Sequence, residues 1–256
     1  MANALIGYTG FVGRNLGDQF KFDQLYNSSN IERLPGQPYD LIVCAGAPGI
    51  KWQANQQPEK DWASIQRLMN SLELACANHV ILISTVDVYN APDHVDEDTP
   101  INAERNHAYG RHRWLLEQFI RDRFAATIIR LPGLFGVGLK KNVIFDLLHD
   151  NALDLVCPDS VYQFYDLIHL WSDIEIARHH RIPLINFATE GVSVREIARK
   201  VFGRDFKNAA QVHPVSYDFR SKYAPIYSGN RHYLYSKAQI MAGLKDFVDG
   251  MKHKAE

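Results

Sequence analysis

Short apolar runs alternate with longer amphipathic stretches through the first half of the chain. Short apolar runs bounded by turn residues are typical of β-strands that are buried in a sheet. The run at residues 41–44 is apolar throughout, as expected of a strand that is covered on both faces. From this pattern we predict early strands at residues 4–8, 24–26, 40–45, 80–85 and 126–131.

The stretches between these runs carry apolar residues at helical spacing. In the clearest case, Ile65, Leu68 and Leu72 recur at intervals of three and four residues. This spacing predicts helices at residues 11–20, 62–77 and 109–124. After about residue 135 the alternation is looser. There we predict a strand at residues 184–188 and helices at residues 143–148, 172–179, 194–202 and 237–251.

Strands that alternate with helices form parallel sheets, and their crossover connections are right-handed. We therefore predict the α/β class, with a Rossmann-type doubly wound parallel sheet and a small C-terminal substrate cap. Residues 1–140 are expected to form the dinucleotide-binding core, and residues 141–256 to complete the sheet and form the cap. Sheets of this kind bind ligands beyond the carboxyl ends of their strands.

Composition narrows the function classes. The chain has 256 residues, of which 46% are hydrophobic and 22% charged, and its formal net charge is −1. This balance gives no basic excess for nucleic acid. The three cysteines are scattered, and no segment has the form of a signal peptide or a membrane span. We expect a cytoplasmic protein with reduced thiols. No histidine has a Cys or Glu partner at zinc-ligand spacing, so we expect no metal site.

A glycine pattern, GxxGxxG, directly follows the first predicted strand and opens the first predicted helix. Glycine permits backbone torsions and close approaches that a Cβ would block. The helix N-terminus offers free N–H groups and a positive dipole end to a pyrophosphate. We therefore predict that NAD or NADP binds here; the alternative is a tight turn without a ligand. The predicted contact residues are Gly7, Thr9, Gly10, Phe11, Val12 and Gly13.

The end of the second predicted strand bears on the choice of cofactor. A carboxylate at this point holds the adenosine ribose hydroxyls in NAD proteins. Residues 27–30 contain none, and Asn27 and Ser28 suit a 2′-phosphate, with Arg14 or Arg33 supplying charge. The sequence therefore favours NADP over NAD, unless this segment is only a polar turn. Small residues after the third predicted strand leave room for the cofactor's phosphates: Ala45, Gly46 and Ala47.

Four segments in chain order carry a resemblance to a known family. They are the glycine loop at 7–13, ISTVDVY at 83–89, YGRHR at 109–113 and RLPGLFG at 130–136. In this combination the chain resembles the extended short-chain dehydrogenase/reductases, the superfamily of NAD-dependent nucleotide-sugar epimerases and dehydratases. The resemblance implies an NAD(P)-dependent oxidoreductase or epimerase that acts on a sugar or nucleotide-sugar by hydride transfer. It also suggests a homodimer.

The family's chemistry uses a Ser or Thr, a Tyr, and a Lys four residues after the Tyr. By position, the resemblance implies that Thr85 orients the reacting oxygen and that Tyr109 is the acid/base. Residue 113 is Arg rather than Lys. Arg113 stays cationic and can donate to ribose hydroxyls, but it cannot join a proton relay because its pKa stays above ~12. These three residues are also expected to contact the cofactor.

The Arg replacement leaves a second function open, a dinucleotide-binding regulatory or scaffold protein with weak or no catalysis. In that case Tyr109 is only an aromatic residue at a helix start. Leu131 and Pro132 match the family's segment beside the cofactor carboxamide. Asp87 stands where the family's dehydratases carry an acid, and either binds substrate or caps a turn. Asn142 either binds a substrate phosphate or caps a helix.

Overall fold

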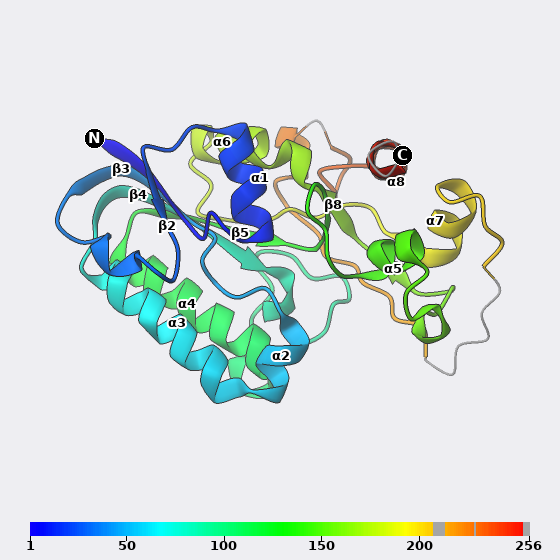
Figure 1. Cartoon of the computed structure of the whole chain (residues 1–256), viewed down its shortest axis with the longest axis horizontal. Helices are drawn as coiled ribbons and strands as arrows, with labels where there is room; N and C mark the ends of the chain where they lie inside the picture. The colour runs from blue at the N-terminus through cyan, green and yellow to red at the C-terminus, as the bar shows by residue number, and fades with distance from the viewer. Residues whose placement is uncertain (207–212, 228, 253–256) are drawn as a thin grey trace. The chain divides into compact units, whose positions relative to one another are not determined.

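The computed structural model describes residues 1–206, 213–227 and 229–252 (Figure 1). The chain divides into two compact units. The sheet unit contains residues 1–91, 98–131 and 170–186. The C-terminal unit contains residues 92–97, 132–169 and 187–256.

The sheet unit is built on a six-stranded parallel sheet with the order β2-β1-β3-β4-β5-β9. The order reverses at β1, which lies between β2 and β3, and such a switch point opens a crevice for ligands. The predicted α/β class and Rossmann-type parallel sheet are confirmed. The strands are β1 Ala2–Ile6, β2 Gln24–Tyr26, β3 Pro38–Cys44, β4 Cys76–Thr85, β5 Ala126–Leu131 and β9 Leu184–Asn186.

Helices cover both faces of this sheet (Figure 1). Helices α3 and α4 pack together on one face, and α1 and α6 on the other. Helix α3 begins with Pro58, whose fixed torsion suits the first helical position, and it buries the predicted apolar stripe. The bounds are α1 Phe11–Gln19, α2 Lys51–Gln56, α3 Pro58–Glu73, α4 Ala108–Arg123 and α6 Leu170–His179.

The prediction of a helix through residue 77 is wrong at its C-terminal end. Cys76 and Ala77 already belong to β4, where they pair with Pro38 and Tyr39 of β3. Sheet pairing therefore overrides the helical periodicity of the segment. Helix α2 was not predicted, because its six residues are too few to show an apolar period. Short 3₁₀ segments occur at Ile31–Arg33, Val86–Val88, Ala103–Arg105, Leu153–Leu155, Leu167–His169 and Ala224–Tyr227.

The strand interiors are fully apolar in β3, where Ile42, Val43 and Cys44 are completely buried. Burial raises the pKa of the Cys44 thiol to about 11, so this thiol stays protonated at neutral pH. Cys44 is therefore a core residue rather than a nucleophile.

A buried ion pair joins α4 to the sheet. Glu117 is fully buried and Arg130 of β5 is 2% exposed. Arg130 Nη2 lies 2.6 Å from Glu117 Oε2, and Ser84 Oγ donates to Glu117 Oε1 at 2.5 Å. Arg130 Nη1 also donates to Tyr89 Oη at 2.8 Å, and that hydroxyl contacts Asn186. The network therefore ties α4 to β4, β5 and β9.

The C-terminal unit has two small sheets and three helices among its described residues. Strand β6 (Gly133–Phe135) pairs in parallel with β8 (Phe164–Asp166). Strand β7 (Val161–Tyr162) pairs antiparallel with β10 (Val192–Ser193). The helices, each near a predicted position, are α5 Val143–His149, α7 Val194–Lys200 and α8 Lys237–Lys252.

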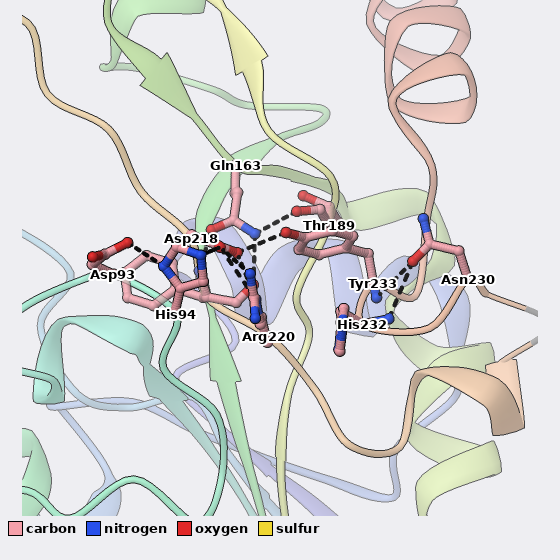
Figure 2. Close-up of polar contacts among 10 residues, drawn as sticks. Asp93, His94, Gln163, Thr189, Asp218, Arg220, Asn230, His232 and Tyr233 are labelled. Carbon is pink, nitrogen blue, oxygen red and sulfur yellow. Dashed lines mark hydrogen bonds and ion pairs between the residues drawn. The ribbon is translucent and has the colours of Figure 1, made fainter.

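Buried Gln163 connects the segments of this unit through its side-chain amide (Figure 2). Its Nε2 donates to the carbonyl oxygens of Thr189 and Phe219, and its Oε1 accepts from the Phe219 N–H at 2.6 Å. All polar groups of the amide are thus engaged. In the described part of the chain, no helix is long and apolar enough to cross a membrane.

We expect Arg130→Met to lower the free energy of unfolding by about 3–5 kcal/mol, because it leaves Glu117 buried without a partner. Urea unfolding followed by circular dichroism measures this loss. Arg121→Met, at an exposed position of α4, the helix that carries Glu117, is the control and should stay within about 0.5 kcal/mol of the parent. The double variant Arg130→Met/Glu117→Leu should recover part of the loss. Equal stability of parent and Arg130→Met would contradict the assigned role.

Candidate dinucleotide and catalytic site

The glycine loop is shaped by close backbone contacts. Gly7 has φ +88°, and a Cβ there would lie 2.3 Å from the Ala45 carbonyl oxygen. A Cβ on Gly13 would lie 2.0 Å from the Gly7 carbonyl oxygen. A Cβ on Gly10 would meet only the Gly7 oxygen, at 3.3 Å. Gly7 and Gly13 are therefore required by the fold of the loop, whereas Gly10 faces outward and is exposed.

The N-terminus of α1 is open to an anion. Gly10 is the N-cap, no side chain accepts a hydrogen bond from the first turn, and no acidic residue lies in that turn. The first N–H groups of a helix lack partners within the helix and carry the positive end of its dipole. The loop and the start of α1 therefore have the features that a pyrophosphate site needs. The predicted contact residues Thr9, Phe11 and Val12 lie in this segment.

The segment after β2 is an organised polar turn. Asn27 Oδ1 accepts from the Ser29 N–H at 2.8 Å, and Asn30 Oδ1 accepts from the Asn27 N–H at 2.7 Å. Asn27 Nδ2 donates to Tyr8 Oη at 3.3 Å and so connects this turn to the glycine loop. The turn leaves Ser28 exposed and contains no carboxylate.

Small residues after β3 have a packing cause. A Cβ on Gly46 would lie 2.9 Å from Ile6 Cγ2 and 3.4 Å from a Leu68 methyl group. Ala45 and Ala47 are half-buried on either side of it. This loop packs closely against β1 and α3, and its small side chains project little beside the glycine loop.

The structure brings Thr85 and Tyr109 together. Thr85 ends β4, and Tyr109 is the second residue of α4. The Thr85 hydroxyl acts on the Tyr109 phenol and lowers its pKa. The start of α4 is held in place by His107, whose Nδ1 accepts from the Gly110 N–H at 3.0 Å. A Cβ on Gly110 would lie 2.1 Å from the Asp87 carbonyl oxygen, so only glycine lets the helix start approach the 3₁₀ turn after β4 this closely.

The environment of Tyr109 favours the protonated phenol. Burial raises the pKa of Tyr109 above its ordinary value. The nearby Arg113 cation and the Thr85 hydrogen bond act to lower that pKa, while the charges of Asp87 and Asp61 raise it further. The net direction is upward, so the phenol is a proton donor at neutral pH.

Arg113 is held by an acid that sequence analysis did not identify. The guanidinium is 2% exposed and forms a two-pronged ion pair with Asp61 of α3, with Nη2 2.8 Å from Oδ1. It also donates to the carbonyl oxygens of Pro48 and Tyr109. Its central carbon lies 4.0 Å from the centroid of the Tyr109 ring. Arg113 Nε is buried without a hydrogen-bond partner. Only this N–H is left for a cofactor ribose.

Asp61 is also hydrogen-bonded to His112, with Oδ2 2.7 Å from Nδ1. Burial alone would raise the pKa of Asp61, but the hydrogen bonds and charges of Arg113 and His112 hold it below its ordinary value. The carboxylate therefore stays ionised. A signal for it exists in the sequence, because Asp61 extends the buried stripe of Ile65 and Leu68. An acid on an apolar helix stripe needs a buried partner.

Lys51, at the start of α2, was also missed. Its Nζ lies 2.6 Å from Asp87 Oδ1, and the two side chains are 43% and 28% exposed. Asp87 Oδ2 lies 3.4 Å from Thr85 Oγ1, and that hydroxyl oxygen accepts from the Asp87 N–H at 3.1 Å. The turn is thus capped by Thr85, and the Asp87 carboxylate faces Lys51. The sequence points to Lys51 as a site residue only through its position, in the segment that follows the carboxyl end of β3.

The remaining predicted residues lie around β5 and in the C-terminal unit. Leu131 ends β5 and is buried, and Pro132 begins the C-terminal unit. Asn142 caps α5, where its Oδ1 accepts from the N–H groups of Ile144 and Phe145 at 3.0 and 3.2 Å. Its Nδ2 donates to the Leu134 carbonyl oxygen at 2.8 Å, so the whole amide is occupied locally.

A charged cluster occupies one part of the C-terminal unit (Figure 2). Ligand-type atoms of Asp93, His94 and Asp218 lie within 4.8 Å of one another. Both nitrogens of the His94 ring face carboxylates, and Asp218 accepts from Tyr233 Oη at 2.7 Å and from Arg220 Nη2 at 2.8 Å. The cluster is therefore built as an ion-pair network, and we assign no cation to it.

Comparison with known protein families matches residues 19–170 to the family described as "NAD dependent epimerase/dehydratase family", which is more than half of the chain. A comparison with curated protein sequences finds no match.

Several solved structures share the fold of the whole chain. MoeE5 in complex with UDP-glucose and NAD has a TM-score of 0.77 at 14% identity, with 100% of both chains covered. A dTDP-4-dehydrorhamnose reductase from Clostridium acetobutylicum has a TM-score of 0.72 at 16% identity, covering 98% of this chain and 100% of that one. UDP-glucose 4-epimerase from Thermotoga maritima, solved with UDP-glucose, has a TM-score of 0.69 at 13% identity, with 100% of both chains covered.

At these identities, the structural likeness establishes the fold alone. The family match rests on the sequence itself and includes the Thr85 and Tyr109 segments described above. Together with the observed sheet order, it shows that this chain belongs to the NAD-dependent epimerase/dehydratase family, the extended short-chain dehydrogenase/reductases.

Proposed function

We propose that the protein binds NAD or NADP across its glycine loop and catalyses hydride transfer to or from a sugar, most naturally one linked to a nucleotide. The proposal rests above all on Thr85 at the carboxyl end of β4 and Tyr109 at the start of α4, where the Thr85 hydroxyl acts on the pKa of the phenol. A hydroxyl beside a buried phenol is the arrangement that the family's acid/base chemistry needs. The glycine loop opens at the same end of the sheet, after β1.

The chain's own residues support a dinucleotide. The uncapped start of α1 would hold the pyrophosphate, and the low loop at residues 45–47 would let the phosphates pass. The unpartnered Arg113 Nε–H would meet a ribose hydroxyl. The exposed turn at Ser28, which lacks a carboxylate, favours NADP. When bound, the nicotinamide supplies the hydride acceptor or donor.

Tyr109 moves the proton in this scheme. In the reducing direction its phenol donates a proton to the substrate oxygen while Thr85 orients that oxygen. The raised pKa keeps the phenol protonated and suits this direction. In the oxidising direction the phenolate accepts the proton, and the Arg113 cation stacked on the ring stabilises the negative charge.

Substrate recognition is assigned to the segments after residue 141. Two of the proteins named above, MoeE5 and the Thermotoga maritima epimerase, were solved with UDP-glucose, which makes a nucleoside-diphosphate sugar the first substrate class to test. Asp87 is the substrate-side acid of the sheet unit. Asn142 contributes by fixing the start of α5 rather than through a free amide.

One observation favours a second function, dinucleotide binding without turnover. Arg113 is neutralised by Asp61, so the cation that would lower the pKa of Tyr109 is partly cancelled. A protein with such a site binds the cofactor and responds to it through conformation or assembly.

We expect Gly13→Ala to weaken NADPH binding by at least about tenfold, which is roughly 1.4 kcal/mol. The added methyl group would lie 2.0 Å from the Gly7 carbonyl oxygen and force the loop out of shape. Gly17→Ala is the matched control on the same helix, because its methyl group would have 3.9 Å of room to Leu5. Fluorescence titration with NADPH and NADH measures both. Unchanged binding in Gly13→Ala would place the dinucleotide elsewhere.

We expect Tyr109→Phe to lower turnover of a UDP-glucose probe by roughly 10²–10⁴-fold, because the proton donor is lost. Cofactor binding should stay the same, which separates catalysis from folding. Nicotinamide absorbance and sugar analysis measure turnover. Full turnover in Tyr109→Phe would remove the mechanism. If turnover occurs only after Arg113→Lys, the second function is the correct one.

We expect Ser28→Asp to weaken NADPH binding relative to NADH by about tenfold or more, because the new carboxylate would repel a 2′-phosphate. Ser64→Asp, at an exposed position of α3, controls for the change in net charge. Titration of each variant with both dinucleotides gives the ratio. If both variants keep the parent ratio, the turn after β2 does not hold the 2′-phosphate.

A further inference from the structure

We propose that Tyr109, Thr85, Asp87 and Lys51 form a proton relay that connects the buried phenol to solvent. This inference rests on the proposed function and extends it. The relay takes the place of the proton route that the family's lysine would provide and that Arg113 cannot.

Three consecutive contacts build the relay. The Thr85 hydroxyl acts on the Tyr109 phenol as a partner that lowers the pKa of that phenol. Thr85 Oγ1 lies 3.4 Å from Asp87 Oδ2. Asp87 Oδ1 lies 2.6 Å from Lys51 Nζ. The single Thr85 hydroxyl hydrogen therefore has two acceptors within reach, one on each side, and a rotating hydroxyl of this kind passes protons between them.

Exposure increases along the relay. Tyr109 is 9% exposed, the Asp87 side chain 28% and the Lys51 side chain 43%. One end of the chain of contacts is thus inside the protein and the other meets water. A buried acid/base needs such a connection, because each turnover in one direction leaves it with one proton too many or too few.

The two neighbouring basic residues, Arg113 and His107, are engaged in other contacts. The Arg113 guanidinium is held by Asp61, and an arginine side chain has no acceptor atom that could receive a proton. His107 faces Lys51, Asp87 and Arg113, and burial, with the Lys51 charge next, lowers its pKa. His107 Nδ1 already accepts from the Gly110 N–H, so that nitrogen is committed to the start of α4.

The relay balances in both directions. In reduction, Tyr109 gives its proton to the substrate oxygen and is refilled from Thr85, Thr85 from Asp87 and Asp87 from the Lys51 ammonium, which takes one proton from water. In oxidation every transfer reverses, and Lys51 releases one proton to water. All four groups return to their starting charges, and no redox partner beyond the nicotinamide cofactor is required.

The direct test measures exchange of the Tyr109 hydroxyl proton with solvent. The probe is the isotope-split ¹³Cζ NMR signal of the tyrosine ring in mixed H₂O and D₂O, recorded on the protein without added ligands. We expect Asp87→Asn to slow this exchange by at least about tenfold, equivalent to a barrier higher by about 1.4 kcal/mol. Lys51→Met should slow it too, and its half-exposed position makes misfolding no concern.

Two controls sharpen this measurement. Lys60→Met removes an exposed lysine of α3 that is outside the relay and should leave exchange unchanged. The buried hydroxyl of Tyr39, which contacts Tyr26 at 2.7 Å, is an internal reference in every variant. Unchanged Tyr109 exchange in Asp87→Asn and Lys51→Met would overturn the relay. A slowed Asp87→Asn with a normal Lys51→Met would overturn the assignment of Lys51 as its outer end.

Turnover of Asp87→Asn gives a second test, because the charge effect alone and the loss of the relay change the rate in opposite directions. The Asp87 charge raises the pKa of Tyr109, so Asp87→Asn lowers that pKa and, through charge alone, would speed oxidation. The relay predicts slower turnover of a UDP-glucose probe despite the lower pKa, with partial rescue by added formate. Faster turnover would overturn the relay. Loss of NADPH binding in the parent would remove the proposed function, while the exchange measurement would still decide the relay.

Discussion

Helix α4 carries two buried charges one turn apart, and each requires a partner of opposite sign. Arg113 pairs with Asp61 of α3, and Glu117 pairs with Arg130 of β5. An unpaired charge at either position would be very costly in this surrounding. The helix is therefore fixed on one side to its neighbouring helix and on the other to the sheet. Because Tyr109 is in the first turn of α4, the same two pairs determine where the phenol lies.

Fixing α4 in this way limits what Arg113 can do in the site. The ion pair that orients α4 also occupies the cation that would otherwise act on Tyr109 and on a ribose. The phenol is left with a raised pKa and with a polar connection through Thr85 toward Asp87 and Lys51. Structure and acid/base chemistry thus compete for one guanidinium, and the arrangement around Lys51 offers a separate proton route.

Much of the fold and part of the site follow from the sequence. The strands of the sheet and the glycine loop are predictable, because apolar period and strand-end position are local signals, whereas the association of Thr85 with Tyr109 was implied by the resemblance to the family. The start of β4 was misplaced because pairing with β3 is not local. The partners of Arg113 and Asp87 were missed for the same reason. Asp61 is 52 residues from Arg113 in the chain, and Lys51 is 36 residues from Asp87. Only folding brings each pair into contact.

The Asp61–Arg113 pair makes the residue type at position 61 depend on the residue type at position 113. A lysine at 113 could not span both carboxylate oxygens as the planar guanidinium does. An arginine at 113 without an acid at 61 would be a buried charge alone. A change at either position therefore calls for a change at the other, and His112 is the partner that Asp61 keeps when Arg113 is replaced.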